Sequence, residues 1–98
     1  MTKVLLITGG SRGIGAATAR LAIAEGYAVA VNYVGDKKAA DDLVKELGSK
    51  AIAVQGNVAT LADVERMFTE TEKAFGLVTH VVNSAGITGK SARLDACD

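Results

Sequence analysis

Four glycines cluster near the start of the chain, in the run Thr8-Gly9-Gly10-Ser11-Arg12-Gly13-Ile14-Gly15. Glycine adopts positive φ at little cost, and because it lacks a Cβ the backbone can come close to a ligand. The first N–H groups of a helix that follows such a turn point at the same place, and the helix dipole favours an anion there. The run therefore predicts a loop that holds the pyrophosphate of a nucleotide, while Gly15 allows the helix to pack closely on a strand.

The context of these glycines makes the interpretation specific. The run follows a short apolar segment, precedes a segment with helical spacing and begins a βαβ pattern, which is the context that the dinucleotide-binding motif requires. The alternative is a glycine-rich turn that binds no ligand.

Short apolar runs and amphipathic segments alternate along the chain. The runs at 4–7, 28–31, 51–54 and 78–82 predict buried strands. Each of the first three is followed by a predicted helix that ends at a glycine, near Gly26, at Gly48 and at Gly76. The predicted apolar stripes of these helices are Ile14, Ala17, Leu21 and Ala22; Ala39, Ala40, Leu43, Val44 and Leu47; and Val64, Met67, Phe68, Thr71 and Phe75.

Two residues mark helix starts. Asp36 can cap the second helix, and Thr60 to Asp63 has the form of a capping box at the start of the third. The element order is therefore β-α-β-α-β-α-β, which predicts a three-layer Rossmann-type α/β fold with a parallel sheet. We interpret residues 1–98 as one NAD(P)-binding domain.

In such a sheet the ligand lies beyond the carboxyl ends of the strands, where the strand order reverses. The predicted strand ends carry polar residues and glycines, namely Thr8-Gly9, Asn32-Tyr33, Gly56-Asn57 and Asn83-Ser84. We expect the site at that edge.

Composition excludes several other classes of protein. The 11 basic residues balance the 11 acidic ones without a long block of either, so neither nucleic acid nor a membrane is an expected partner. No apolar run reaches the about 20 residues of a membrane span, and the start lacks the apolar stretch of a signal peptide. Cys97 is the only cysteine, which excludes an internal disulfide and favours a cytoplasmic location. No metal site is expected.

Three motifs together resemble the short-chain dehydrogenase/reductase family. Thr8 to Gly15 matches its Thr-Gly-x-x-x-Gly-x-Gly signature, Asn57-Val58 is similar to its Asp-Val pair, and Asn83-Ser84-Ala85-Gly86 is similar to its Asn-Asn-Ala-Gly motif. The chain looks like the N-terminal half of the β-ketoacyl-carrier-protein reductase and glucose dehydrogenase groups. The resemblance implies hydride transfer between a nicotinamide dinucleotide and a small carbonyl or alcohol substrate.

Residues for binding the dinucleotide follow from these motifs and from the strand ends. They are Gly9, Ser11, Arg12, Gly13, Ile14, Gly15, Asn32, Tyr33, Asn57, Val58, Asn83, Ala85 and Gly86. In the family an aspartate at the position of Asn57 accepts a hydrogen bond from adenine, and the Asn carbonyl retains that capacity. Ser84 replaces the second asparagine of the later motif.

The residues at the end of the second strand favour NADP over NAD. NAD-binding Rossmann units hold the ribose hydroxyls with an acidic residue there, whereas this chain has Asn32 and Tyr33. Arg12 can bind the 2′-phosphate of NADP, and Lys37 and Lys38 add positive potential. Asp36 is the counter-argument, since it could reach a ribose hydroxyl, although its place favours a capping role.

No catalytic residue is expected within the chain. The resemblance implies a Ser, Tyr and Lys group that would lie beyond Asp98, so we expect a natural protein that is longer, with the chain truncated before the catalytic half, and a homo-oligomer at full length. Tyr33 and Lys37 match the family's Tyr-x-x-x-Lys spacing by chance, on the adenosine side of the site. His80 is predicted to be a packed or hydrogen-bonded strand residue. The alternatives are a non-catalytic nucleotide-binding module and an inactive fragment that binds nothing.

Overall fold

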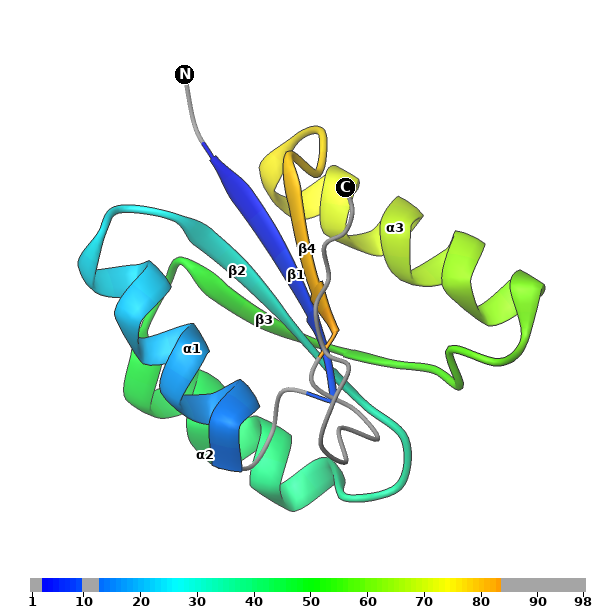
Figure 1. Cartoon of the computed structure of the whole chain (residues 1–98), viewed down its shortest axis with the longest axis horizontal. Helices are drawn as coiled ribbons and strands as arrows, with labels where there is room; N and C mark the ends of the chain where they lie inside the picture. The colour runs from blue at the N-terminus through cyan, green and yellow to red at the C-terminus, as the bar shows by residue number, and fades with distance from the viewer. Residues whose placement is uncertain (1–2, 10–12, 84–98) are drawn as a thin grey trace.

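A computed structural model describes residues 3–9 and 13–83 of the chain. Strands and helices alternate through these residues (Figure 1). The elements are β1 (Val4–Thr8), α1 (Gly13–Ala24), β2 (Ala28–Tyr33), α2 (Lys37–Leu47), β3 (Ala51–Gln55), α3 (Leu61–Phe75) and β4 (His80–Asn83).

The four strands form one parallel sheet in the order β3-β2-β1-β4. In the middle of the sheet, Leu6 of β1 is in register with Ala30 of β2 and Val81 of β4. The chain thus builds the sheet outward from β1 to β3 and then returns to the other side of β1. This return makes the junction between β1 and β4 the point where the strand order reverses, as the predicted Rossmann-type fold requires.

Helices cover both faces of the sheet, with α1 and α2 on one face and α3 on the other (Figure 1). Alternate side chains of β1 and β2 pack into two clusters, because successive residues of a strand point to opposite faces. Leu5, Ile7, Val29 and Val31 contact the α1–α2 layer, and Leu6, Ala30 and Val54 contact Met67 of α3. The three-layer architecture expected from the sequence is confirmed.

The apolar faces of α2 and α3 are the predicted ones, whereas of the stripe predicted for α1 only Ala22 is buried. Ile14 and Leu21 are 65% and 69% exposed. The buried residues of α1 are the small ones, Gly15, Ala16, Ala19 and Ala22. Because α1 is apolar on nearly every side, the periodicity did not single out one face. Small side chains let the helix approach the sheet closely, and this decides which face is buried.

The helix starts differ in how they are capped. The Asp36 carboxylate accepts a hydrogen bond from Ala39 N at 3.0 Å, so the predicted cap of α2 is confirmed. Thr60 precedes α3 as predicted, but its side chain makes no capping hydrogen bond. The capping box is not formed, because Asp63 instead accepts a hydrogen bond from the backbone N–H of Asn57 at 2.8 Å.

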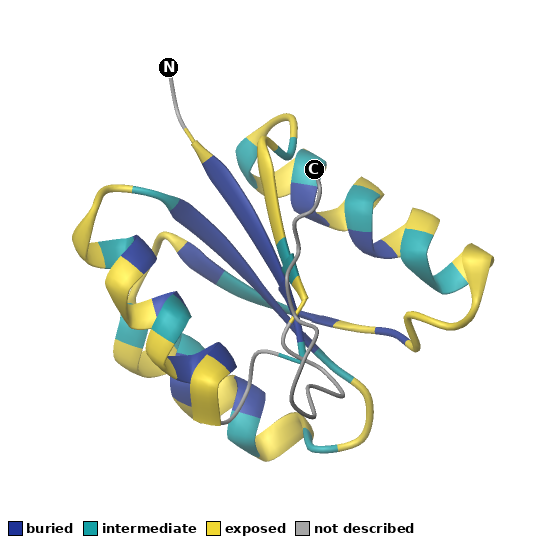
Figure 2. Cartoon of the chain, in the orientation of Figure 1, coloured by how far each residue is buried: buried dark blue, intermediate teal, exposed yellow. Residues whose placement is uncertain are grey.

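The fourth strand begins later than predicted, at His80 rather than Val78. Just before β4, Thr79 contacts the start of β1 through its backbone and its side chain: its N–H donates to Val4 O at 2.9 Å, and its Oγ1 accepts from Val4 N at 2.9 Å. Within the described residues β4 is an edge strand, and Figure 2 shows it as mostly exposed beside the buried β1 and β2. None of the helices in the described part is long and apolar enough to cross a bilayer.

Candidate functional site

The carboxyl ends of the strands bring together most of the predicted site residues. Thr8 ends β1 and Gly9 follows it, and Asn32 and Tyr33 end β2. Asn57 lies in the loop after β3, and Asn83 ends β4. Four predicted site residues, Ser11, Arg12, Ala85 and Gly86, lie outside the described residues.

At Gly9 and Gly13 the glycine-rich segment has the backbone that its sequence predicts. Gly9 and Gly13 have φ of 66° and 55°, in the left-handed region that favours glycine. Gly13 is the first residue of α1, and a Cβ built on it meets no atom within 4 Å. Among the described residues nothing fills the position of a Cβ at Gly13, and the first N–H groups of a helix are suited to bind an anion. Ile14 is exposed at this end of α1, while Gly15 is buried against the sheet.

A hydrogen bond joins β1 to β4 where the strand order reverses. The buried hydroxyl of Thr8 donates to Asn83 Oδ1 at 2.9 Å. This contact fixes the end of β4 beside the beginning of the glycine-rich segment, so Asn83 borders the candidate site.

Asn32 lies at the same edge, but its side chain points into the protein. The residue is 1% exposed, and its Oδ1 accepts a hydrogen bond from Gly9 N at 3.0 Å. Its Nδ2 donates to Gly56 O at 3.0 Å. The neighbouring Tyr33 is half-buried, and its carbonyl accepts a hydrogen bond from Gly56 N at 3.0 Å.

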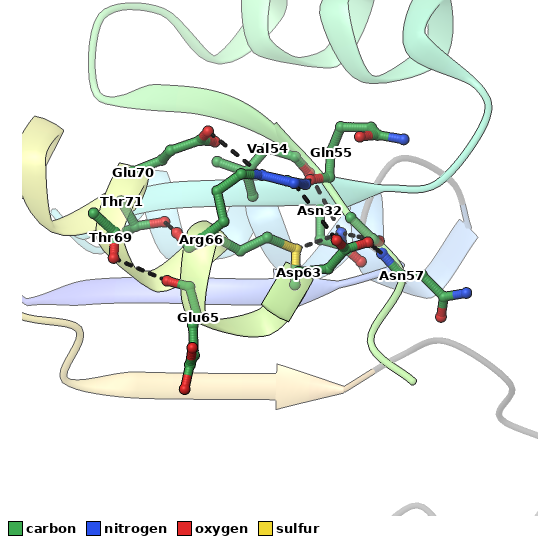
Figure 3. Close-up of polar contacts among 12 residues, drawn as sticks. Asn32, Val54, Gln55, Asn57, Asp63, Glu65, Arg66, Thr69, Glu70 and Thr71 are labelled. Atoms are coloured by element: carbon green, nitrogen blue, oxygen red, sulfur yellow. Dashed lines mark hydrogen bonds and ion pairs between the residues drawn. The ribbon is translucent and has the colours of Figure 1, made fainter. Parts of the chain in front are cut away.

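The loop between β3 and α3 is held by side chains from α3 (Figure 3). Asn57 Oδ1 accepts a hydrogen bond from Ala59 N at 2.8 Å, which forms a local turn, and Asn57 N donates to Asp63. Arg66 donates to the carbonyl of Gln55 and lies 3.6 Å from Asp63 Oδ1. Sequence reasoning did not assign Asp63 and Arg66 to the site. Their spacing of three residues on one helix face was the only signal for their pairing.

The lysines after β2 contribute less positive potential than their sequence suggests. Lys37 donates to Asp41 at 2.7 Å and Lys38 donates to Asp42 at 3.0 Å, each an i,i+4 pair on α2. These hydrogen bonds raise the pKa of each lysine above its usual value. Because a carboxylate lies beside each ammonium, the positive potential expected from Lys37 and Lys38 is partly offset.

His80 lies at the first residue of β4, at the opposite end of the strand from Asn83. Its Nδ1 is 2.8 Å from Thr79 Oγ1, and its ring meets Tyr27 edge-on with centroids 5.3 Å apart. His80 is hydrogen-bonded as predicted, although it is exposed rather than packed in the core. The described residues contain no group of three or more His, Cys, Asp or Glu side chains that could hold a metal ion.

Comparisons with known proteins agree with this geometry. A family model for short chain dehydrogenases matches residues 3–98. A 3-oxoacyl-acyl-carrier-protein reductase, FabG, of Staphylococcus aureus is 46% identical over 91 residues, covering 90% of this chain and 37% of that protein. The uncharacterized oxidoreductase YgfF of Escherichia coli is 42% identical over 87 residues, covering 86% of this chain and 35% of that protein.

Among solved structures, a double mutant of a Serratia marcescens short-chain dehydrogenase/reductase is similar, with a TM-score of 0.81 and 31% identity. The match covers 88% of this chain and 36% of the Serratia chain. The chain therefore spans little more than a third of the length of the relatives it matches.

Proposed function

This chain belongs to the short-chain dehydrogenase family, and we propose that it binds NADP at the carboxyl edge of its sheet as the cofactor-binding part of an oxidoreductase. The glycine-rich segment carries the proposal. Gly9 follows β1 and Gly13 begins α1, both with positive φ, beside the point where the strand order reverses, and a Cβ on Gly13 would meet no described atom within 4 Å. This arrangement fits a pyrophosphate, because backbone N–H groups and the positive end of the helix converge on it.

Each segment at the edge has a proposed role. Gly13, Ile14 and Gly15 present the start of α1 to the pyrophosphate, together with Ser11 and Arg12. Asn57 and Val58 face the adenine, for which the exposed Asn57 carbonyl keeps a second lone pair after its bond to Ala59 N. Asn83, Ala85 and Gly86 line the path toward the nicotinamide.

Two observations support NADP over NAD. The end of β2 offers Tyr33 rather than a carboxylate that would repel a 2′-phosphate. The acid nearest in sequence, Asp36, uses its carboxylate to cap α2. Arg12 is proposed to supply the charge that binds the 2′-phosphate, since Lys37 and Lys38 are paired with aspartates.

For the whole protein we propose the oxidation or reduction of a small carbonyl or alcohol substrate, in a homo-oligomer and in a reducing compartment such as the cytoplasm. A bound nicotinamide dinucleotide supplies or accepts the hydride. The residues of this chain bind and orient it, and we assign none of them a proton-transfer role. A non-catalytic nucleotide-binding module is the alternative, and a hydride-transfer assay with NADPH and simple ketones on the full-length protein separates the two.

Titration of the chain with NADPH, followed by the fluorescence of the dihydronicotinamide, tests the binding site. Gly13→Val should abolish binding, because the new side chain fills the space proposed for the pyrophosphate. Gly26→Val is the matched control: Gly26 also has positive φ, at 92°, and open surroundings, but it lies in the turn before β2, at the other edge of the sheet. Equal affinity in Gly13→Val and the unmodified chain would refute the site.

A further inference from the structure

Asn32 is a buried polar side chain at the edge where the dinucleotide is proposed to bind. With Thr8 and Thr71 it makes up the buried polar residues of the described part of the chain. Its carboxamide contacts the glycine-rich segment at Gly9. It also contacts the loop after β3 and α3 (Figure 3). A buried amide costs free energy unless its donors and acceptor are satisfied, so these contacts explain how it is tolerated.

The surroundings of the amide fix its orientation. On one side Oδ1 accepts from the backbone N–H of Gly9 at 3.0 Å, and an N–H group can only donate. On the other side Nδ2 lies 3.0 Å from Gly56 O and 3.3 Å from Val54 O, and carbonyl oxygens can only accept. The sulfur of Met67 is 2.9 Å from the same nitrogen. The site thus requires a side chain with an acceptor and a donor at this separation.

We propose that Asn32 is a positioning residue for the dinucleotide site, one that fixes the start of the glycine-rich loop relative to the loop that follows β3. This inference rests on the proposed function, because the first loop is assigned to the pyrophosphate and the second to the adenine. Asn32 then contacts no cofactor itself. It sets the distance between the loop that binds the pyrophosphate and the loop that binds the adenine of the same dinucleotide.

The contact between Gly9 and Asn32 limits which N–H groups can bind the pyrophosphate. Gly9 N–H donates to Asn32, so the phosphate oxygens bind N–H groups further along the loop and at the start of α1. Gly9 contributes its left-handed backbone, with φ of 66°, and directs the chain away from β1.

Asn32→Asp gives a sharp test, because the carboxyl group has nearly the same shape as the amide. An ionised carboxylate accepts from Gly9 N–H but presents oxygen to Gly56 O and Val54 O. A protonated carboxyl has one donor and one acceptor and restores both contacts. Burial and the facing carbonyls raise the pKa of this carboxyl in the folded variant above the unfolded value of about 3.9. The stabilising protonated form is therefore present at low pH and is lost as the pH rises through the folded pKa.

The measurement is the NADP⁺ dissociation constant of Asn32→Asp and of the unmodified chain by calorimetry, from pH 5 to pH 8. The ratio of the two constants at each pH cancels the titration of the 2′-phosphate. We expect the variant to bind about tenfold more weakly at pH 8, as the loss of one buried hydrogen bond implies, and to approach the unmodified chain at pH 5. A ratio near one at every pH would overturn the proposal.

Thr71→Val is the matched control. Thr71 is fully buried, and its hydroxyl donates to Met67 O at 2.7 Å within α3, so the variant loses a buried hydrogen bond without touching either loop. We expect lower thermal stability but an unchanged NADP⁺ dissociation constant. If Thr71→Val weakens binding as much as Asn32→Asp does, the effect is one of general stability and the positioning role fails.

The unmodified chain provides a direct measurement that does not depend on a variant folding. Scalar coupling across the hydrogen bond between the Gly9 amide nitrogen and the Asn32 side-chain carbonyl carbon should be observed by NMR. It should persist when NADP⁺ is added. Absence of the coupling without ligand would overturn the assigned contact. Loss of the coupling with NADP⁺ would overturn the claim that the Gly9 N–H stays bonded to Asn32 rather than to phosphate. Failure of the unmodified chain to bind NADP⁺ would instead refute the proposed function, while the coupling and the pH-dependent stability of Asn32→Asp would still report on the contact.

Discussion

Gly56 lies at the end of β3 under the side chain of Met67, and Gly56→Ala should destabilise the fold. A Cβ built on Gly56 would lie 2.7 Å from Met67 Sδ and 3.0 Å from Met67 Cγ. Both distances are shorter than ordinary van der Waals contacts between such atoms, about 3.5–4.0 Å. Met67 is 1% exposed and packs against Leu6, Ala30 and Val54, so it has little room to move.

The expected loss follows from overpacking. Adding a carbon to a filled core costs about 1–3 kcal/mol. For a domain of this size each 1 kcal/mol lowers Tm by about 4–8 °C. Urea denaturation followed by circular dichroism gives the change in the free energy of unfolding. Gly56 has no positive φ, so backbone strain does not contribute.

Gly35→Ala is the control, because a Cβ on Gly35 meets no atom within 4 Å and its φ is not positive either. That variant should be neutral or more stable by about 0.4–1 kcal/mol, through reduced entropy of the unfolded chain. In a Met67→Ala background the cost of Gly56→Ala should fall, since the two nearest atoms are gone and only Arg66 Nη2, at 3.3 Å, remains close. Equal stability of Gly56→Ala and Gly35→Ala, or an undiminished cost without Met67, would refute the packing argument.

Three further predictions concern a cap, an ion pair and the cofactor. Asp36→Ala removes the hydrogen bond to Ala39 N and should lower the free energy of unfolding by about 1 kcal/mol in urea denaturation, whereas equal midpoints would contradict the cap. Glu46 accepts a hydrogen bond from Arg20 Nε at 2.6 Å, and this lowers the pKa of the Glu46 carboxyl below 4.5. The contribution of this ion pair to folding stability is therefore present above pH 4.5 and is lost as the pH falls through the folded pKa. Glu46→Gln should therefore lose less stability on acidification than the unmodified chain, seen as a small difference in Tm. High salt should remove this difference, because the ion pair is exposed. Tyr33→Asp should weaken NADP⁺ binding more than NAD⁺ binding in calorimetric titrations, because a carboxylate repels the 2′-phosphate, and an unchanged ratio of affinities would argue against a 2′-phosphate near β2.

The order of the elements could be predicted from the sequence because the signals are local. Apolar runs such as Val4 to Ile7 identify buried strands, and a glycine marks the end of each of α2 and α3. The cap at Asp36 was also predictable, since a carboxylate three residues before a backbone N–H needs no distant partner. The left-handed conformations of Gly9 and Gly13 follow from the same local chemistry.

Which of several possible partners a charged side chain binds could not be predicted in this way. Asp63 looked like part of a capping box with Thr60, but the loop after β3 brings Asn57 N within 2.8 Å of it. Lys37 and Lys38 were expected to add positive potential, but each pairs with an aspartate one turn further along α2. In both cases the side chain binds a partner other than the one that the sequence suggested.

The sequence by itself determined the glycine-rich loop, the alternation of strands and helices, and the resemblance that the comparisons confirmed. Only the tertiary structure decided which side of α1 is buried, because Ile14 and Ala16 are both apolar and the distance to the sheet favours the smaller residue. Only the tertiary structure decided that Asn32 points inward to Gly9 and Gly56, residues 23 and 24 positions away. Helix and strand propensity depends on neighbouring residues, whereas the contacts of Asn32 and the buried side of α1 depend on how the whole sheet assembles around β1.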